Sequence, residues 1–598
     1  MDLTNPDALL YLGGLQMSQG HFAEAAATFQ QLLQLRPAFV ELYNDLGVAF
    51  AQQGKREEAA ASFQRALALK SDYPEAHNNL GIVLAQQGQW DQAIIHYSEA
   101  LRLRPDYAEA HNNLGIARAR QGQLDEAITH YGEALRLRPE YAEAHNNLGL
   151  ALVEQGNGDA ALASYEQALR LQPNYAEAHY NRGLVLAKME KLDEAIASYH
   201  EALRLRPDYA EAYNNLGVAL GNKGQLEESV ACLREALRLK PDYAEACYNA
   251  GLVLVSSGSL RVQEQKLKEA IACYQQALRI KPDYALAHKD LAMAWLRLGD
   301  FEQGWPEYEW RWQCPDVPNP TFAHPRWDGT PLAGRTILLH AEQGLGDTLQ
   351  FIRYAPLVQQ TGGKVLAICQ PSLFHLLSRS PGIDDLLTTG SRLPDFDVQA
   401  PLLSLPGIFR TTLATIPAQV PYLFADPQLR DQWQMEMNRR PGFKIGIAWQ
   451  GNPAHVQDRR RSLPLAGFEP LTRLERGELY SLQVGPGVDQ LAHVGFPVID
   501  LGSRFNPACF QDAAAAILAL DLVITVDSAI AHLAGGMGIP VWVLLPYVPD
   551  WRWLLEREDS PWYPTMRLFR QAEREDWDGV IHRVVDAVIE QIAGTALI

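Results

Sequence analysis

The sequence is poor in cysteine, in basic residues relative to acidic ones, and in long uncharged apolar runs. Its six cysteines are scattered, with no CxxC pair and no metal-ligand spacing: Cys232, Cys247, Cys273, Cys314, Cys369 and Cys509. A disulfide framework and a structural zinc site are therefore not expected. We predict reduced, buried thiols, as in a cytoplasmic protein.

Positive charge is in deficit: 52 Lys and Arg residues stand against 71 Asp and Glu residues, a formal net charge of -19. Such a chain repels phosphate, which argues against nucleic acid and against anionic membrane surfaces as partners. The start of the sequence has no basic region followed by an apolar core, so no signal peptide is predicted.

The longest membrane-like window, residues 529–548, has no Asp, Glu, Lys or Arg but contains Gly535, Gly536, Gly538 and Pro540. These glycines and the proline favour a helix, a tight turn and a buried strand over a membrane span. We therefore expect a protein that is not integral to a membrane and is located in the cytoplasm.

What the first half does contain is self-similarity. One glycine recurs every 34 residues: Gly13, Gly47, Gly81, Gly115, Gly149, Gly183, Gly217 and Gly251. Prolines keep the same spacing at Pro37, Pro105, Pro139, Pro173, Pro207 and Pro241. This period, with an alanine in a second helix and a proline after it, is the tetratricopeptide-repeat signature.

One repeat illustrates the expected packing. Gly115 is predicted to let the two helices approach closely, Ala127 and Ala134 to supply small contacts, and Pro139 to end the second helix. Between Gly251 and Pro282 there are seven extra residues, which predict a longer turn around residues 256–265.

A single helical pair cannot bury its own apolar face, so stacked pairs are expected to form a continuous core and a concave groove. We predict an all-α superhelix of tetratricopeptide repeats over residues 1–300. Its groove is expected to bind a peptide or protein partner.

The residue two before each repeat glycine forms what we call the asparagine column. It begins with Asp45 and continues as Asn79, Asn113, Asn147, Asn181, Asn215 and Asn249. Carboxamides in a line can donate to and accept from a peptide backbone without reading its sequence. Alternatively, they bond neighbouring repeats to one another. The column resembles the asparagine ladder in the repeats of O-linked N-acetylglucosamine transferase, which grips protein substrates.

Residues 301–334 differ in composition from the repeats. Tryptophans at 305, 310, 312 and 327 alternate with six prolines, which is too aromatic for a flexible tether. We expect this junction to cap the open end of the superhelix and to join it to the next domain.

After Arg335, short apolar runs alternate with amphipathic stretches, as in parallel sheets covered by helices. Strands are predicted at 336–340, 364–369, 398–400, 444–449, 479–484, 498–501, 522–526 and 540–545, with a helix over 348–360. A break near Pro441 and Gly442 favours two Rossmann-like lobes, residues 335–432 and 433–598. In such folds ligands bind beyond the carboxyl ends of the strands.

Three motifs fall at predicted strand ends. Residues 342–347 carry Gly344, Gly346 and Asp347, whose glycines allow close approach of backbone to a ligand. Residues 448–453, followed by 458–464, include three arginines that can clamp phosphate. Residues 525–529 open a helix whose free amides suit an anion, with His532 one turn on. Each has a simpler interpretation: helix capping for the first and third, a solvated basic loop for the second.

In this order and spacing the three motifs resemble glycosyltransferase family 9, which includes the ADP-heptose:lipopolysaccharide heptosyltransferases. The resemblance covers roughly residues 335–592 and includes the tail from Trp551-Arg552-Trp553 to Trp562-Tyr563. It implies the two-lobed GT-B fold and inverting sugar transfer from a nucleotide sugar. The combination of repeats with such a domain is similar in layout to O-linked N-acetylglucosamine transferase.

The resemblance implies a role for individual residues. Asp347 corresponds to the general base toward the acceptor hydroxyl, and Arg461 falls where the family has a phosphate-contacting lysine. Asp527 and Ser528 open the diphosphate-binding helix. Gln483 lies on a strand lining the nucleotide site. The remaining residues assigned to the donor site are Gly344, Gly346 and His532.

No metal or other cofactor is predicted. Asp395-Phe396-Asp397 superficially resembles a metal-binding Asp-x-Asp, but it leads directly into a short predicted strand. We predict a metal-independent glycosyltransferase whose acceptor, a glycan or a protein, is recruited by the repeats. The alternative is a repeat scaffold for protein interactions whose transferase-like domain is inactive.

Overall fold

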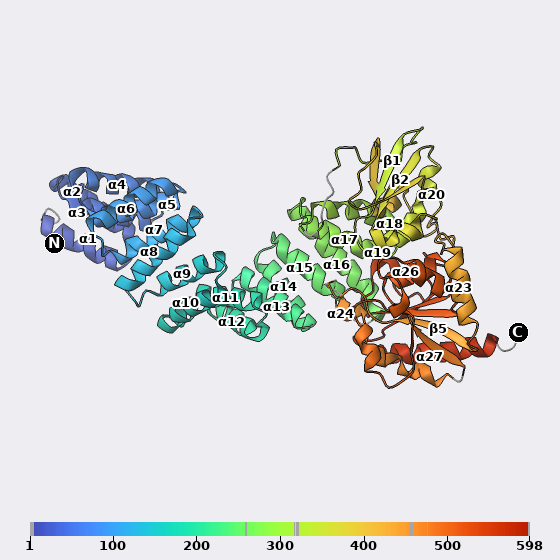
Figure 1. Cartoon of the computed structure of the whole chain (residues 1–598). Coiled ribbons are helices and arrows are strands. Elements are labelled where there is room, and N and C mark those ends of the chain that lie inside the picture. The colour runs from blue at the N-terminus through green and yellow to red at the C-terminus, as the bar shows by residue number, and fades with distance from the viewer. Residues whose placement is uncertain are drawn as a thin grey trace. The chain divides into compact units, whose positions relative to one another are not determined.

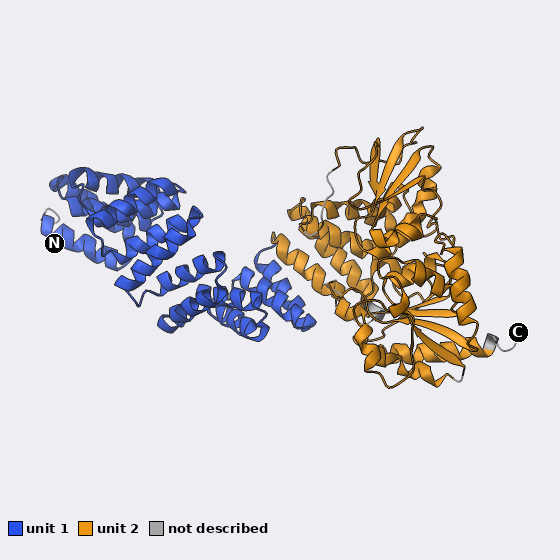
Figure 2. Ribbon diagram, in the orientation of Figure 1, with its two compact units in different colours: residues 1–241 blue, residues 242–598 orange. Residues whose placement is uncertain are grey.

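The computed structural model describes residues 5–256, 260–315, 317, 322–454, 458–474 and 476–595. The chain divides into two compact units, residues 1–241 and residues 242–598, coloured separately in Figure 2. The division falls inside the repeats, so the repeat helices after Pro241 belong to the same unit as the α/β part. Each unit is described by itself.

The first unit consists of paired antiparallel helices (Figure 1). The pairs are α1 (Pro6–Ser18) and α2 (Phe22–Leu35), α3 (Val40–Gln52) and α4 (Arg56–Leu69), α5 (Pro74–Gln86) and α6 (Trp90–Leu103), α7 (Ala108–Arg120) and α8 (Leu124–Leu137), α9 (Ala142–Glu154) and α10 (Gly158–Leu171), α11 (Ala176–Lys188) and α12 (Leu192–Leu205), and α13 (Ala210–Asn222) and α14 (Leu226–Leu239). The predicted all-α repeat architecture is confirmed.

The recurring glycine lets the two helices of a pair touch. A Cβ atom built on Gly115 would lie 2.6 Å from a ring carbon of Tyr131, closer than two carbon atoms pack. The same clash would arise at Gly81 with Tyr97 and at Gly149 with Tyr165. The predicted close approach is therefore confirmed. A large side chain of the second helix, aromatic except for Leu233 opposite Gly217, explains why glycine recurs every 34 residues.

A matched pair of substitutions tests this packing. Gly115→Ala forces a methyl group against Tyr131 and should destabilise the α7–α8 pair by about 1–3 kcal/mol. Gly132→Ala in α8 is the control, because a Cβ atom there meets nothing within 4 Å. It should stabilise the pair by about 0.5–1 kcal/mol. Amide hydrogen exchange of α7 and α8 in the full chain measures both effects. Equal exchange in the two variants would contradict this explanation of the glycine.

The second unit begins with four further repeat helices: α15 (Ala244–Ser256), α16 (Leu260–Ile280), α17 (Ala285–Arg297) and α18 (Phe301–Tyr308). Here one expectation is wrong. The seven extra residues do not mainly lengthen a turn, because α16 has 21 residues where α14 has 14. Residues 260–268 contain neither glycine nor proline, so they add helical turns at the start of α16. Residues 257–259 lie outside the described residues.

The tryptophans of the junction pack as predicted, between the last repeat helices and the α/β part. The Trp305 ring meets the Trp551 ring edge-on at 5.3 Å between centroids, and Phe301 contacts Trp551 and Trp562. The Trp305 indole donates to the Thr411 carbonyl at 2.9 Å. Part of the proline-rich stretch, residues 316 and 318–321, lies outside the described residues.

The first α/β lobe has a four-stranded parallel sheet in the order β3-β2-β1-β4. Its strands are β1 (Thr336–His340), β2 (Lys364–Cys369), β3 (Asp385–Thr388) and β4 (Val398–Pro401), and its helices are α19 (Leu345–Phe351), α20 (Ala355–Gln359), α21 (Phe374–Leu377) and α22 (Leu405–Ile408). The helix predicted over 348–360 is interrupted by a 3-10 turn at Ile352–Tyr354. Pro356 lacks an N–H group, so the ladder of hydrogen bonds breaks there.

The second lobe has a six-stranded parallel sheet in the order β10-β9-β8-β5-β6-β7. Its elements are α23 (Pro427–Met437), β5 (Phe443–Ala448), α24 (Asp458–Arg461), β6 (Gly477–Ser481), β7 (Ile499–Asp500), α25 (Gln511–Ile517), β8 (Leu522–Val526), α26 (Ala529–Gly536), β9 (Val541–Leu545), β10 (Met566–Arg570) and α27 (Trp577–Thr595). The alternation of strands and helices thus predicted the sheets correctly. It missed β3 and β10, which are edge strands with charged residues.

Alternate residues of β1 face two different cores. Ile337 and Leu339 belong to a large cluster that includes Trp305 and Trp551, whereas Leu338 packs on the opposite face of the sheet. The large cluster therefore joins the end of the repeats and both lobes into one folded unit. Among the described residues, no helix is long and apolar enough to cross a membrane.

Candidate functional site

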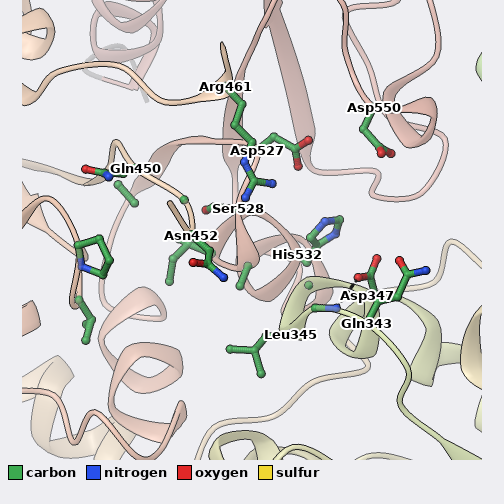
Figure 3. A pocket seen from close by; sticks show the side chains of 18 of the residues that line it. Gln343, Leu345, Asp347, Gln450, Asn452, Arg461, Asp527, Ser528, His532 and Asp550 are labelled. Carbon is green, nitrogen blue, oxygen red and sulfur yellow. Dashed lines mark hydrogen bonds between the residues drawn. The ribbon is translucent and has the colours of Figure 1, made fainter. Parts of the chain in front are cut away.

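A cavity of about 770 Å³ lies between the two lobes, beyond the carboxyl ends of β1, β5, β8 and β9. The residues that line it include all eight for which the sequence predicted a role in catalysis or donor binding: Gly344, Gly346, Asp347, Arg461, Gln483, Asp527, Ser528 and His532. Figure 3 shows Asp347 on one side of this cavity and Arg461, Asp527 and Ser528 on the other. Residues 180 positions apart in the sequence are thus brought together.

Asp347 lies in the first turn of α19, and its carboxylate contacts both lobes. One carboxylate oxygen accepts a hydrogen bond from the amide of Gly344, the N-cap residue, at 2.8 Å. The other accepts from the guanidinium of Arg552. The side chain keeps 18% of its surface exposed toward the cavity. Helix capping, the simpler interpretation of this motif, is therefore real, and it leaves the carboxylate on the cavity wall.

Arg552 is the residue that sequence reasoning missed. It lies in the short 3-10 helix Trp551–Trp553, called the WRW segment below, just after β9. Its guanidinium pairs with Asp347 and Asp550 and donates to the Gln350 side chain at 2.8 Å. Burial alone would lower the pKa of Arg552, but Asp550 and Asp347 together raise it. A basic residue between two tryptophans after a buried strand was the available signal.

The N-terminus of α26 faces the cavity. Ser528 is its N-cap, and the Ser528 hydroxyl lies 3.1 Å from that of Thr525. Ala529 and Ile530, the first residues of the helix, line the cavity as well. Because the first amides of a helix have no partner within it, this end can donate hydrogen bonds to an anion.

His532 lies deeper in α26 and is held by its neighbours. Its Nδ1 is 2.8 Å from the Tyr563 hydroxyl, and its ring stacks on Trp553. Burial, followed by the charge of Arg552, lowers the pKa of His532 to about 3, so the ring is neutral at ordinary pH. A Cβ atom on Gly346 would lie 2.7 Å from this ring. Gly346 is thus required for packing α19 on α26.

Asp527, at the end of β8, carries an unusual carboxyl group. Burial and the nearby charge of Asp550 raise its pKa to about 6. Two carboxylates close together cannot both ionise without penalty, and Asp550, held by Arg552, is the one whose pKa is lowered. Asp527 therefore takes up a proton more readily than an ordinary aspartate.

Arg461 ends α24 and reaches toward α26 in Figure 3. Its Nε lies 3.3 Å from Asp458, and 20% of its side chain is exposed. A Cβ atom on Gly451 would be 2.8 Å from the Arg461 guanidinium, so the glycine makes room for it. Asp458 thus holds the Nε of Arg461, and the side chain remains partly open to the cavity.

Gln483 lines the cavity as predicted, two residues past the end of β6, but its carboxamide is already hydrogen-bonded within the protein. Its side-chain oxygen accepts from the Trp449 and Gln450 amides, and its nitrogen donates to the Gln450 and Pro486 carbonyls. These four bonds occupy the donors and acceptors of the carboxamide. Gln483 therefore fixes the loop after β5 and shapes the cavity wall.

The asparagine column lies along the first helix of each repeat. The amides of Asn79, Asn113, Asn147 and Asn181 donate, at 3.0–3.1 Å, to an asparagine of the preceding repeat: Asn44, Asn78, Asn112 and Asn146. Asn215 donates to the Tyr180 hydroxyl, and Asn249 lies half-buried in α15. The column thus bonds neighbouring repeats, as the alternative interpretation expected. Its contact with a peptide stays a prediction.

The Asp395-Phe396-Asp397 motif has a structural explanation. Phe396 is buried, and Asp397 accepts a hydrogen bond from the Thr336 amide at 2.7 Å. Within the described ranges, no group of three or more His, Cys, Asp or Glu side chains could hold a metal ion. None of the six cysteines, all within the described residues, forms a disulfide; Cys247, Cys314 and Cys369 are buried and the others half-buried.

Comparisons with known proteins identify the repeats. Residues 72–140 match a family model described as tetratricopeptide repeat, and a TPR-repeat model matches 13–54, 49–88, 149–190, 187–224, 220–258 and 258–299. Residues 13–299 thus carry tetratricopeptide repeats, which are protein-interaction repeats. Protein FlbA of Caulobacter vibrioides is 27% identical over 330 residues, 49% of this chain and 53% of FlbA. The chain therefore spans about half the length of this relative.

Several solved structures match part of the chain. YrrB, titled a TPR protein with an unusual peptide-binding site, is 27% identical; the match covers 31% of this chain and 96% of that one, with a TM-score of 0.28. A chain of the APC/C hetero-tetramer Cut9-Hcn1 is 19% identical over 48% of this chain and 55% of that one, with a TM-score of 0.38.

The raised pKa of Asp527 makes a testable prediction about stability. Its folded-state pKa of about 6 exceeds the ordinary 3.8, so its contribution is fully present below pH 4 and is lost as pH rises through 6. Asp527→Asn should therefore raise the free energy of unfolding at pH 8 by at most about 3 kcal/mol, and the melting temperature should rise with it. At pH 4 both quantities should change little. Scanning calorimetry at both values measures this. Exposed Asp395→Asn is the control; equal effects of Asp527→Asn at the two pH values would contradict the assignment.

Proposed function

We propose that this tetratricopeptide-repeat chain is a glycosyltransferase. It transfers a sugar, with inversion, from a nucleotide-sugar donor to an acceptor recruited by the repeats, and it needs no metal ion. One observation carries the proposal: a carboxylate from the first lobe and anion-binding groups from the second line the same cavity. The two parallel sheets facing this cavity support a GT-B fold with two Rossmann-like lobes.

The second lobe provides a place for the donor diphosphate. Arg461 and the N-terminus of α26 lie on the same side of the cavity, so they can bind the phosphates and stabilise the charge that develops on the leaving group. The volume of about 770 Å³ lies within the usual range of ligand-binding cavities, about 300–1,000 Å³.

The first lobe provides the general base. Asp347 is oriented by the Gly344 amide and by the Arg552 guanidinium, and both contacts leave it on the cavity wall. As the acceptor oxygen forms its bond to the anomeric carbon, Asp347 takes the hydroxyl proton. The bond from that carbon to the diphosphate breaks, and the diphosphate leaves with the electron pair.

The base assignment is tested by Asp347→Asn. The amide keeps the size and part of the hydrogen bonding, but it cannot accept the acceptor proton. We expect turnover, measured as release of nucleoside diphosphate from a panel of nucleotide sugars with acceptor extract, to fall at least about 100-fold. Binding of the nucleoside diphosphate should change little.

The control is Asp395→Asn, because Asp395 is exposed and lies outside the cavity. It should leave turnover unchanged. Full activity of Asp347→Asn would remove the base role. No turnover of any donor by the unaltered chain would instead favour the alternative, a protein-interaction scaffold with an inactive transferase-like domain.

A further inference from the structure

A second cavity, of about 470 Å³, lies in the second unit between the last repeat helices and the second lobe. Met293, Arg460, Pro546 and Val548 line both this cavity and the proposed transfer site, so the two are adjacent. We call it the arginine cavity, because four arginines line it: Arg297, Arg459, Arg460 and Arg574. The carboxylates in its lining are Asp290 and Glu575.

Positive charge is in excess in this lining. Asp550 and Asp290 lie close enough to act on the charge of Arg297, but burial outweighs them and lowers the pKa of Arg297. Four arginines still face only two lining carboxylates, and Asp290 already accepts a hydrogen bond from Tyr248 at 2.7 Å. Arg574 donates to the Ser256 carbonyl, which orders it but leaves its charge in place. In a protein with a net charge of -19, such a local excess of positive charge selects an anionic ligand.

Arg297 is the most informative of the four. It is the last residue of α17, where the helix dipole favours a cation, but its buried Nε has no hydrogen-bond partner among the described residues. An unsatisfied donor on a buried guanidinium is costly to the folded protein. The cost is recovered when a ligand carboxylate occupies the cavity and accepts from this group.

The repeat helices determine what kind of ligand reaches the cavity. Asn249 and Leu252 share one face of α15 with Ser256, at positions i, i+3 and i+7, and Leu252 and Ser256 line the cavity. The face of α15 that carries Asn249 therefore continues into the arginine cavity. A peptide lying along this face would end at the arginines, next to Met293 and the transfer site.

We propose that the arginine cavity binds acidic side chains of a peptide acceptor and places the neighbouring hydroxyl at the transfer site. The acceptor part of this inference rests on the proposed function, whereas the binding of an acidic peptide does not. The occupant is thus a protein segment in which Asp or Glu residues flank the modified Ser or Thr.

The test compares two fluorescein-labelled nonapeptides, one with glutamates on both sides of a central serine and one with every glutamate replaced by glutamine. Fluorescence anisotropy on the full chain should show at least about tenfold tighter binding of the acidic peptide. The preference should disappear in the double variant Arg297→Gln/Arg574→Gln and fall in Arg459→Gln, an exposed position. It should persist in Arg439→Gln, an exposed arginine outside the cavity.

Two controls keep the outcomes apart. The Arg297 Nε has no hydrogen-bond partner within the described part of the chain and burial of its charge is unfavourable, so Arg297→Gln should not lower the melting temperature. The same peptides are titrated into Asp347→Asn, where the preference should remain, so loss of turnover and loss of peptide binding are separate results. Equal binding of both peptides, or a preference that survives the double variant, would overturn the inference. So would weaker nucleoside diphosphate binding in the double variant, since that would assign the cavity to the donor.

Discussion

The ion pair between Arg552 and Asp347 is the contact on which the site depends. It joins a side chain of the second lobe to the first turn of α19 in the first lobe. Both partners are largely buried, and Arg552 also pairs with Asp550, so removing Arg552 would take the counter-ion from two carboxylates, a change that usually costs about 3–5 kcal/mol. The pair therefore sets the distance between the lobes at the cavity and orients the carboxylate within it.

The residues on either side of Arg552 extend this connection to the rest of the second unit. Trp551 packs on Trp305 and Phe301 of the last repeat, and Trp553 stacks on His532 of α26. The WRW segment therefore touches the repeats, the first lobe and α26 within three residues. Arg353 reinforces the arrangement from the first lobe by donating to the Trp562 carbonyl at 2.6 Å and to the Tyr422 hydroxyl at 2.7 Å. The last repeats are consequently part of the wall of the site.

The sequence predicted the fold well where the spacing of residues follows from how side chains pack. The 34-residue glycine period follows from the ring of Tyr131 and its equivalents, and buried strands such as Leu522–Val526 stand out as apolar runs. The strand ends then located the residues of the cavity. Edge strands such as β10 lacked that signal because their exposed positions are charged.

Side-chain partners were much less accessible from the sequence. No residue near Asp347 in the sequence predicts its pairing with Arg552, which follows 205 positions later. Likewise Gln483 and the asparagine column offer amides that suit a ligand, but the structure commits Gln483 to backbone bonds and the column to neighbouring repeats. The distinction depends on which groups lie within 3 Å, and only the folded chain determines that.

If both lobes together form the proposed nucleotide-sugar site, the full chain must bind a nucleoside diphosphate. The most direct measurement is calorimetric titration of the full chain, without added metal, with a panel of nucleoside diphosphates, repeated on Arg461→Ala. We expect one nucleotide to bind saturably with 1:1 stoichiometry. Its binding to the variant should be weaker, because Arg461 faces the helix N-terminus at Ser528. Absence of binding across the panel, or binding that Arg461→Ala leaves unchanged, would contradict it.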